Sequence, residues 1–461
     1  MTFMRSGFLV LSVGVGEFSA NFLRNAIIAR LLSVEDFGTV ATFSLLASLL
    51  DLAGQVGLDR MMVQAKDADD PRLQATLHTV QLGLGIIAAM LLLIMAWPYA
   101  HFMSTPALAA SYATLALIPI MRGLTHLDRA RLQRQGQFGP WAIRQIIPPV
   151  ASLLVIYPAY LWLGDYRVAL VAIYTQQVMA LVASYIGAQW RYTLGFDRDL
   201  INRALAFGWP MTANSLLLYF VFNGDRLIVS NQFGLATLGW FSAAVMLTMT
   251  PMNFVARTLQ TVLLPAMARQ QENPIMLQRQ YDLTISLLGL VAIGFVSSLA
   301  LVGGRALVLI FGAKFAPAEP FIILLAMAQG IRLLRAAPAL VAMAMAETRN
   351  PLYANIVRGI FILVGLAVAL RTQSIFALIV VSIIGEILST GFAGWFVHRK
   401  LGLYARHLYI VLASSMMASI LLFAVVRMQW PIWSILPAVL IILLPTARAL
   451  PQIMRLLGRA A

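Results

Sequence analysis

The 461-residue chain contains no cysteine and only five histidines. Without cysteine it can form no disulfide, offer no thiol nucleophile and hold no metal through sulfur. The histidines are never paired at a metal-ligand spacing, which disfavours a metal hydrolase. A Gly-x-x-x-x-Gly-Lys-Ser/Thr phosphate loop is also missing, so direct use of ATP by this chain is not expected. We therefore expect a protein that is not an enzyme, with no catalytic residue, no metal and no other cofactor.

Charge is scarce as well, because charged residues make up 11% of the chain and hydrophobic residues 61%, with a mean hydropathy of +0.84. About fourteen apolar stretches follow one another, each near the roughly twenty residues that cross a bilayer as a helix. The stretches are too long for barrel strands and do not alternate. The sequence thus predicts an all-α polytopic membrane protein. Its spans are expected at residues 7–31, 39–63, 77–97, 107–124, 141–163, 168–190, 207–230, 237–265, 283–302, 320–343, 352–370, 374–397, 408–426 and 430–446.

The basic residues gather in every second connector and in both tails, which is the positive-inside asymmetry of membrane proteins. The asymmetry predicts that both termini are cytoplasmic. The first apolar run reaches to about Leu32, is longer than a signal-peptide core and contains polar residues, so we expect it to stay in place as a span. A formal net charge of +15 would suggest nucleic acid in a soluble domain, but here no single basic helix or patch carries it. Topology and attraction to anionic headgroups account for the charge, so membrane lipids are expected partners and nucleic acid is not.

Four predicted spans carry a polar stripe along one helical face, which is unusual because an ionisable group at bilayer depth is costly. Small polar residues also hold helices together, and this alternative accounts about equally well for the Ser, Thr and Asn members taken singly. The stripes are Glu17, Asn21 and Arg24 with Asn25 beside them; Ser44, Ser48, Asp51 and Gln55; Asn214 and Asp225 with Ser215 and Arg226 beside them; and Thr250, Asn253, Arg257 and Gln260.

Four stripes that each contain a charge predict one shared, water-filled cavity between the first, second, seventh and eighth spans. Arg24 and Arg257 are the candidates for holding an anion, because a guanidinium stays charged and forks onto phosphate oxygens. Two roles are open for the carboxylates Glu17, Asp51 and Asp225: charge balance for these arginines, or proton or cation coupling. Other embedded charges are expected to snorkel toward the cytoplasmic side, namely Arg144, Arg332, Arg335, Arg358 and Glu386.

The first and second spans recur as the seventh and eighth, and two registers are open. Arg30-Leu31-Leu32 with Phe37-Gly38 can be laid on Arg226-Leu227-Ile228 with Phe233-Gly234, whereas matching Gly38 to Gly239 aligns the polar stripes better. Both copies start on the cytoplasmic side, so they form a parallel repeat, an arrangement found in transporters. Local sequence adds a resemblance to bacterial oligosaccharide flippases of the polysaccharide transport family. The stretches that resemble this family are Ala29 to Gly38 (ARLLSVEDFG), Gly57 to Gln64 (GLDRMMVQ), Phe207 to Pro210 (FGWP), Gly224 to Val229 (GDRLIV) and Leu238 to Ala244 (LGWFSAA).

The resemblance implies the fold of the multidrug/oligosaccharidyl-lipid/polysaccharide (MOP) exporter superfamily, two six-helix lobes around a central cavity. The lobes would be residues 1–190 and 191–397, followed by two additional helices and a basic cytoplasmic tail in 398–461. It also implies a bacterial inner-membrane location, a polyprenyl-diphosphate-linked oligosaccharide as cargo, and a polysaccharide polymerase and export machinery as partners. The cavity residues that fit this implication are Arg24, Arg226 and Arg257 with the amides Asn21, Asn25, Asn214, Asn253 and Gln260.

Two other functions stay open at this point. A drug or metabolite exporter on the same scaffold should have a less cationic cavity. A membrane-embedded polysaccharide polymerase or ligase would need a sizeable outer loop, and the longest expected outer connector, residues 303–319, offers only Arg305, Lys314 and Glu319. The coupling energy, from an ion gradient or from consumption of the cargo outside, is not indicated by the sequence.

Overall fold

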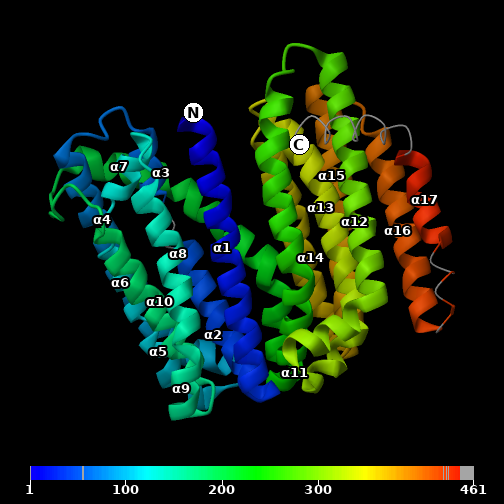
Figure 1. Cartoon of the computed structure of the whole chain (residues 1–461), viewed down its shortest axis with the longest axis horizontal. Coiled ribbons are helices and arrows are strands. Elements are labelled where there is room, and N and C mark those ends of the chain that lie inside the picture. Colours follow the sequence, from blue (N-terminus) through cyan, green and yellow to red (C-terminus); the bar gives the residue numbers. More distant parts are fainter. Residues whose placement is uncertain (1, 54–56, 429, 432, 434–435, 447–461) are drawn as a thin grey trace. The chain divides into compact units, whose positions relative to one another are not determined.

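The computed structural model describes residues 2–53, 57–428, 430–431, 433 and 436–446, and every regular element in these ranges is a helix. The all-α prediction is therefore confirmed, and each of the fourteen expected spans coincides with a helix, a pair of helices or part of one (Figure 1). The bounds are α1 Thr2–Leu31, α2 Val34–Ala53, α3 Leu58–Gln64, α4 Pro71–Phe102, η1 Pro106–Leu108, α5 Ala109–Thr114, α6 Leu117–Gly123, α7 Asp128–Arg134, α8 Gly139–Leu154, α9 Ile156–Leu163, α10 Arg167–Tyr185, α11 Arg198–Ala268, α12 Pro274–Phe311, η2 Ala313–Ala318, α13 Glu319–Ala344, α14 Arg349–Thr372, α15 Ile375–Leu401, α16 Arg406–Arg427 and α17 Leu436–Thr446.

Nine helices in the described ranges are long and apolar enough to cross a membrane, or ten if the bent pair Pro106–Gly123 and Asp128–Arg134 counts as one span. Helix α11 is longer than any single span because it joins the seventh and eighth expected spans. The two parts meet at Gly234, whose φ of 79° and ψ of 174° lie outside the helical region and suit glycine. A multi-pass helical membrane protein follows from these lengths and compositions.

The chain forms two compact units, which we call unit 1 and unit 2. Unit 1 comprises Met1–Asn223 and Phe233–Gly239, and unit 2 comprises Gly224–Gln232 and Trp240–Ala461. Helix α11 thus contributes to both units. The division into 1–190, 191–397 and 398–461 expected from the family resemblance stays a prediction, and its basic tail falls in residues 447–461, outside the described ranges.

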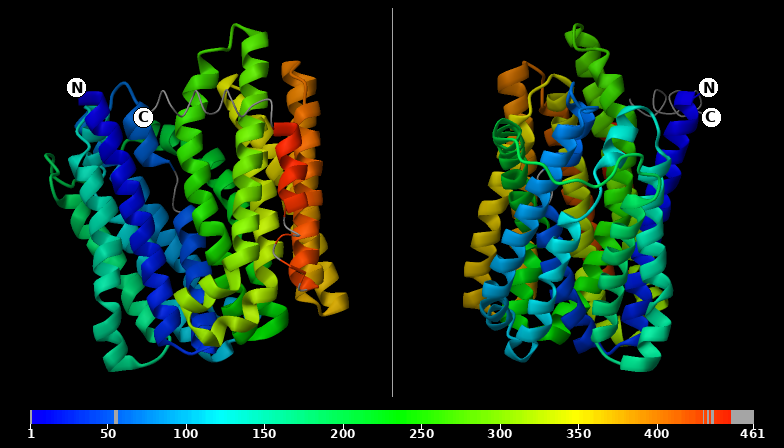
Figure 2. Two further views of the ribbon diagram at one scale, coloured as in Figure 1. Left: turned by 45° about the vertical axis from the view of Figure 1, so that its right-hand side comes forward. Right: turned by 90° about the vertical axis from the view of Figure 1, so that its left-hand side faces the viewer.

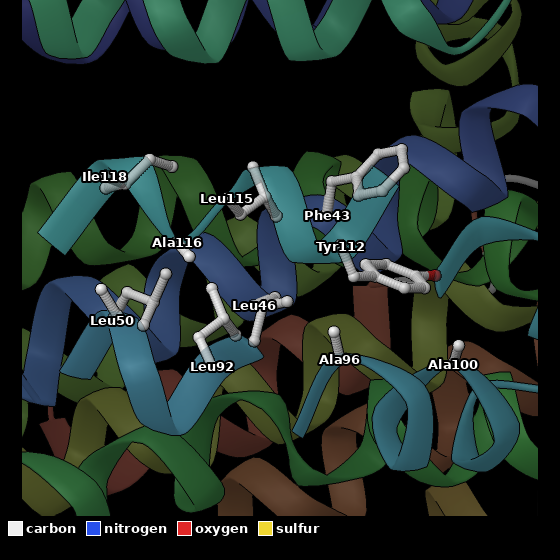
Figure 3. Packing of buried hydrophobic residues seen from close by; sticks show 11 residues of the cluster. Phe43, Leu46, Leu50, Leu92, Ala96, Ala100, Tyr112, Leu115, Ala116 and Ile118 are labelled. Carbon is white, nitrogen blue, oxygen red and sulfur yellow. The ribbon is translucent and has the colours of Figure 1, made fainter. Parts of the chain in front are cut away.

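Unit 1 contains an apolar core between α2, α4, α5 and α6 (Figure 3). Alanines on α4, among them Ala96 and Ala100, let the neighbouring helices approach closely. Tyr112 is fully buried in this core, and its hydroxyl group lies 2.7 Å from the hydroxyl oxygen of Thr42. The core ends where Leu50 precedes Asp51 on α2, and that end carries the polar groups described below.

The predicted repeat is visible in a reciprocal backbone contact within unit 1. A Cβ atom on Gly38 would lie 2.0 Å from the carbonyl oxygen of Leu235, and one on Gly239 would lie 2.4 Å from the carbonyl oxygen of Val34. Gly239 follows Gly38 by the same number of residues as Leu235 follows Val34, 239 − 38 = 235 − 34 = 201. A contact in which i meets j and j meets i is what a two-fold relation produces. The contact supports the register that matches Gly38 to Gly239.

Unit 2 is built around α13. In the span Ala313–Ala344, 78% of the most apolar stretch is buried inside the protein, against 28% for Arg349–Thr372. Helices α12 and α15 pack on α13, and α17 lies beside α16 and α12 (Figure 2). Polar side chains on α13 are therefore enclosed by other helices.

Candidate functional site

The polar stripe of α1 faces α8 and α10, which lie beside one another in unit 1 (Figure 1). Arg24 Nη1 donates to Ser152 Oγ on α8 at 3.4 Å and to Gln176 Oε1 on α10. Two helical turns from Arg24 along α1, Glu17 Oε2 accepts a hydrogen bond from Gln145 Nε2 on α8 at 3.0 Å. The stripe therefore lies against polar partners within one unit.

Two amides of the same stripe are less engaged. Asn21 Nδ2 donates to the backbone oxygen of Glu17 at 2.9 Å, so its side chain is hydrogen-bonded to the backbone of its own helix. Asn25 is half-buried beside Arg24. Neither amide bridges to another helix through a hydrogen bond in the described ranges.

Asp51 on α2 forms an ion pair with Arg122 on α6, a residue that the sequence patterns did not single out. Arg122 Nε also donates to Gln177 Oε1 on α10 at 3.3 Å. The side chains of Arg122 and Asp51 are 23% and 45% exposed, so this pair is reachable from outside the protein core. Asp51 thus balances an arginine, but not one of those expected; Gln55 of the same stripe lies outside the described residues.

Arg144 on α8 belongs to the same region. It lies close enough to Arg122, Arg129, Asp59 and Glu17 to interact with their charges. Its Nε is buried and has no hydrogen-bond partner in the part of the chain that the structure describes. The expectation that Arg144 merely snorkels is wrong in this respect, because its guanidinium group is turned partly into unit 1. We call the following residues the unit 1 polar cluster: Glu17, Arg24, Asp51, Arg122, Arg144, Gln145, Ser152, Gln176 and Gln177.

Unit 2 contains a second set of embedded charges, centred on the fully buried Glu386 of α15. Arg332 of α13 donates to Glu386 Oε1 through Nη2 at 2.6 Å and through Nε at 2.9 Å. Arg358 Nε of α14 donates to the same oxygen at 3.1 Å, and Arg335 Nη2 lies 3.5 Å from Glu386 Oε2. Three guanidinium groups therefore compensate one buried carboxylate.

Asp225 of α11 extends this network, because its Oδ2 accepts hydrogen bonds from Arg358 Nη2 at 3.0 Å and from Ser382 Oγ at 2.6 Å. Asp225 is thus paired with Arg358, which belongs to none of the four polar stripes. We call Asp225, Arg332, Arg335, Arg358 and Glu386 the unit 2 ion network.

The prediction that Arg332, Arg335, Arg358 and Glu386 snorkel is wrong. Arg332 and Arg335 are three residues apart and so share one face of α13, the enclosed helix of unit 2. Glu386 lies within a long apolar run, where an unpaired charge is costly, so its carboxylate is expected to have a charged partner. These two signals could have revealed the network, whereas the identity of the partners could not be read from the sequence.

The remaining predicted site residues are distributed over both units. Asn214 is exposed and lies in unit 1, while Arg226 and Asn253 are half-buried in unit 2. Arg257 and Gln260 are exposed in unit 2. The shared cavity of the four stripes stays a prediction.

The two charge groups have the same composition and different accessibility. Each contains three arginines and two carboxylates, for a formal charge of 3 − 2 = +1. In unit 2, Glu386 is fully buried and the Arg358 side chain is 1% exposed, whereas in unit 1 the Asp51 side chain is 45% exposed. The unit 2 ion network is therefore suited to holding helices together, and the unit 1 polar cluster to meeting a ligand.

Comparison with known proteins identifies relatives. A family model described as polysaccharide biosynthesis protein matches residues 27–320. The lipopolysaccharide biosynthesis protein WzxC of Escherichia coli (strain K12) is 22% identical over 318 residues, covering 68% of this chain and 63% of WzxC. The succinoglycan biosynthesis transport protein ExoT of Rhizobium meliloti (strain 1021) is 24% identical over 332 residues, covering 70% of this chain and 65% of ExoT. The matched region is thus slightly less than two thirds of each relative.

Solved structures show the same fold at low sequence identity. The lipid II flippase MurJ in an inward closed conformation aligns with a TM-score of 0.70 and 13% identity, covering 97% of this chain and 99% of MurJ. An inward-facing multidrug resistance MATE family transporter of the MOP superfamily aligns with a TM-score of 0.69 and 14% identity, covering 84% and 94%. The expected superfamily fold is confirmed. Because the family model matches well over half of its 461 residues, the chain belongs to the polysaccharide biosynthesis protein family.

Proposed function

We propose that the protein is a flippase, not an enzyme, and that it moves a polyprenyl-diphosphate-linked oligosaccharide from the cytoplasmic to the outer leaflet for extracellular polysaccharide or O-antigen synthesis. The observation that carries the proposal is the excess of arginine over carboxylate in the partly exposed unit 1 polar cluster. Guanidinium groups match the geometry of phosphate oxygens and stay charged at bilayer depth.

A cargo of this kind needs cationic and polar groups along its path through the membrane. A diphosphate headgroup with sugars cannot cross hydrocarbon unaided, because its charges would lose their hydration without compensation. The prenyl tail can stay in lipid throughout. Arginines and amides that replace phosphate hydration, together with alternating access of the two lobes 1–190 and 191–397, would meet both requirements. Besides Arg24, the proposed contacts are Arg226 and Arg257 with the amides Asn21, Asn25, Asn214, Asn253 and Gln260.

The relatives support the cargo class. ExoT is named a transport protein of succinoglycan biosynthesis, and MurJ is named a lipid II flippase. We propose a location in the bacterial inner membrane, as the family resemblance implies, with both termini in the cytoplasm, as the positive-inside asymmetry predicts. A polysaccharide polymerase and export machinery would then take up the cargo on the outer side.

A drug or metabolite exporter is the alternative, favoured by the similarity to a multidrug resistance transporter. Such an exporter would not need three arginines in one embedded cluster. A membrane-embedded polymerase or ligase is less favoured, because the relatives named above are designated for transport.

Transport by the purified full-length chain in liposomes tests the proposal. The cargo is an undecaprenyl-diphosphate-linked oligosaccharide placed in one leaflet, and a membrane-impermeant glycosidase reports its arrival in the other. We expect the wild type to move this lipid, and Arg24→Ala and Arg257→Ala to slow it by roughly tenfold each, as the loss of one charge-assisted hydrogen bond predicts. Absence of transport by the wild type would overturn the flippase, and unchanged rates in both variants would remove the anion-site argument.

A further inference from the structure

We infer that Arg122 and Arg144, together with Arg24, form a diphosphate-ester binding site inside unit 1. The inference rests on the proposed function, because it assigns the headgroup of the flipped lipid to a place within one unit. It adds two residues that neither the polar stripes nor the family resemblance indicate.

Two arginines of this site are held by uncharged side chains. Arg24 is oriented by Gln176, and Arg122 donates at 3.3 Å to the adjacent Gln177. An amide oxygen accepts a hydrogen bond but carries no charge. The two neighbouring glutamines of α10 therefore fix guanidinium groups from α1 and α6 without neutralising them.

Arg144 is incompletely paired. Its Nε is buried without a hydrogen-bond partner in the described part of the chain. A buried donor normally has a partner, and exceptions call for an explanation such as a ligand. Arg144 and Arg122 also lie close enough to repel each other, and an anion placed between them would relieve that repulsion.

Access and charge also favour an anionic ligand at this site. Asp51, whose side chain is 45% exposed, holds Arg122 from the open side of the cluster. A diphosphate ester carries more negative charge than one carboxylate, so it can compete with Asp51 for the guanidinium group. The unit 2 ion network contains the same number of arginines, but Glu386 at its centre is fully buried and already accepts hydrogen bonds from Arg332 and Arg358, so this network makes no comparable site.

The experiment measures lipid binding to the purified full-length chain in nanodiscs. The probes are undecaprenyl diphosphate, undecaprenyl monophosphate and phosphatidylglycerol, which separate a diphosphate ester from a single phosphate and from ordinary headgroups. We expect the wild type to prefer the diphosphate. Arg144→Gln should weaken diphosphate binding by about tenfold and monophosphate binding less. Asp51→Asn should strengthen diphosphate binding, because the competing carboxylate is gone.

Two further variants keep the result interpretable. Arg167→Gln is the matched control, because Arg167 is exposed in the same unit and pairs only with Asp165 in the described ranges; its binding should equal that of the wild type. The double variant Asp51→Asn with Arg122→Gln removes both charges of one pair, so it leaves no uncompensated group and should still weaken diphosphate binding. Thermal unfolding of each variant checks that it is folded.

The inference would be overturned if Arg144→Gln and the double variant both bound the diphosphate as tightly as the wild type does. Equal binding of phosphatidylglycerol and the diphosphate by the wild type would also overturn it. Neither result touches the proposed function if the wild type transports the lipid in liposomes. Conversely, absence of transport by the wild type would overturn the proposed flippase function, whatever the binding measurements show.

Discussion

At the scale of single residues, Glu386 shows how one carboxylate can hold three helices. It is fully buried and accepts hydrogen bonds from Arg332 of α13 and Arg358 of α14. Glu386→Gln takes the buried carboxylate away from Arg332 and Arg335 and leaves Arg358 with Asp225 alone, so we expect a loss of stability of about 3–5 kcal/mol. Thermal unfolding of the purified protein measures it. Asp165→Asn is the control, because its pair with Arg167 is exposed and should contribute little. Equal unfolding temperatures for Glu386→Gln and the wild type would contradict the role assigned to the network.

A second prediction at the scale of single residues concerns how the stability of the protein changes at acid pH. Arg203 donates to both carboxylate oxygens of Asp67, at 2.7 and 3.0 Å, and these hydrogen bonds hold the pKa of Asp67 below its ordinary value of 3.8. A lowered pKa in the folded state stabilises the protein above pH 3.8, and this contribution is lost as the pH falls through the folded-state pKa. Both side chains are partly exposed, so the effect is on the order of 0.5 kcal/mol.

The measurement compares thermal unfolding of the wild type and Asp67→Asn between pH 7 and pH 3. We expect the wild type to be slightly more stable near neutral pH, and the difference to shrink toward zero at the acid end. A difference that grows as the pH falls would show that the sign is wrong.

At the scale of elements, the contact of α2 with α11 depends on two glycines. A Cβ atom at Gly38 would lie 2.0 Å from the carbonyl oxygen of Leu235, a distance that real Cβ atoms do not adopt, so the helices would have to separate. Gly38→Ala and Gly239→Ala should each destabilise unit 1, by about 2 kcal/mol or more, as overpacking does. Gly83→Ala in α4 is the matched control, since nothing lies within 4 Å of its Cβ position and alanine favours a helix. Unfolding temperatures that fall for all three variants alike would argue against the contact.

Elements were predictable from the sequence to different degrees. Long apolar runs predict the spans, because the bilayer fixes their length. The stripe of α1 predicts that Arg24 faces a polar interior; Arg24 donates hydrogen bonds to Ser152 and Gln176, and the water-filled cavity itself stays a prediction. Arg122 was missed because it is the only charged residue of α6 and forms no stripe. Pairing across helices depends on which faces meet, and helix periodicity gives a face but not its neighbour.

At the scale of the whole molecule, the absence of cysteine makes the predicted orientation directly testable. The positive-inside asymmetry places the connectors around Lys66 and Glu272 in the cytoplasm, and those around Ala107 and Arg371 outside. All four side chains are exposed, so each can be replaced singly without disturbing the core. In intact cells, a membrane-impermeant maleimide should label Ala107→Cys and Arg371→Cys. Lys66→Cys and Glu272→Cys should react only after the membrane is opened. The cysteine-free wild type is the control, and labelling of Lys66→Cys or Glu272→Cys in intact cells would invert the orientation and with it the direction of the proposed transport.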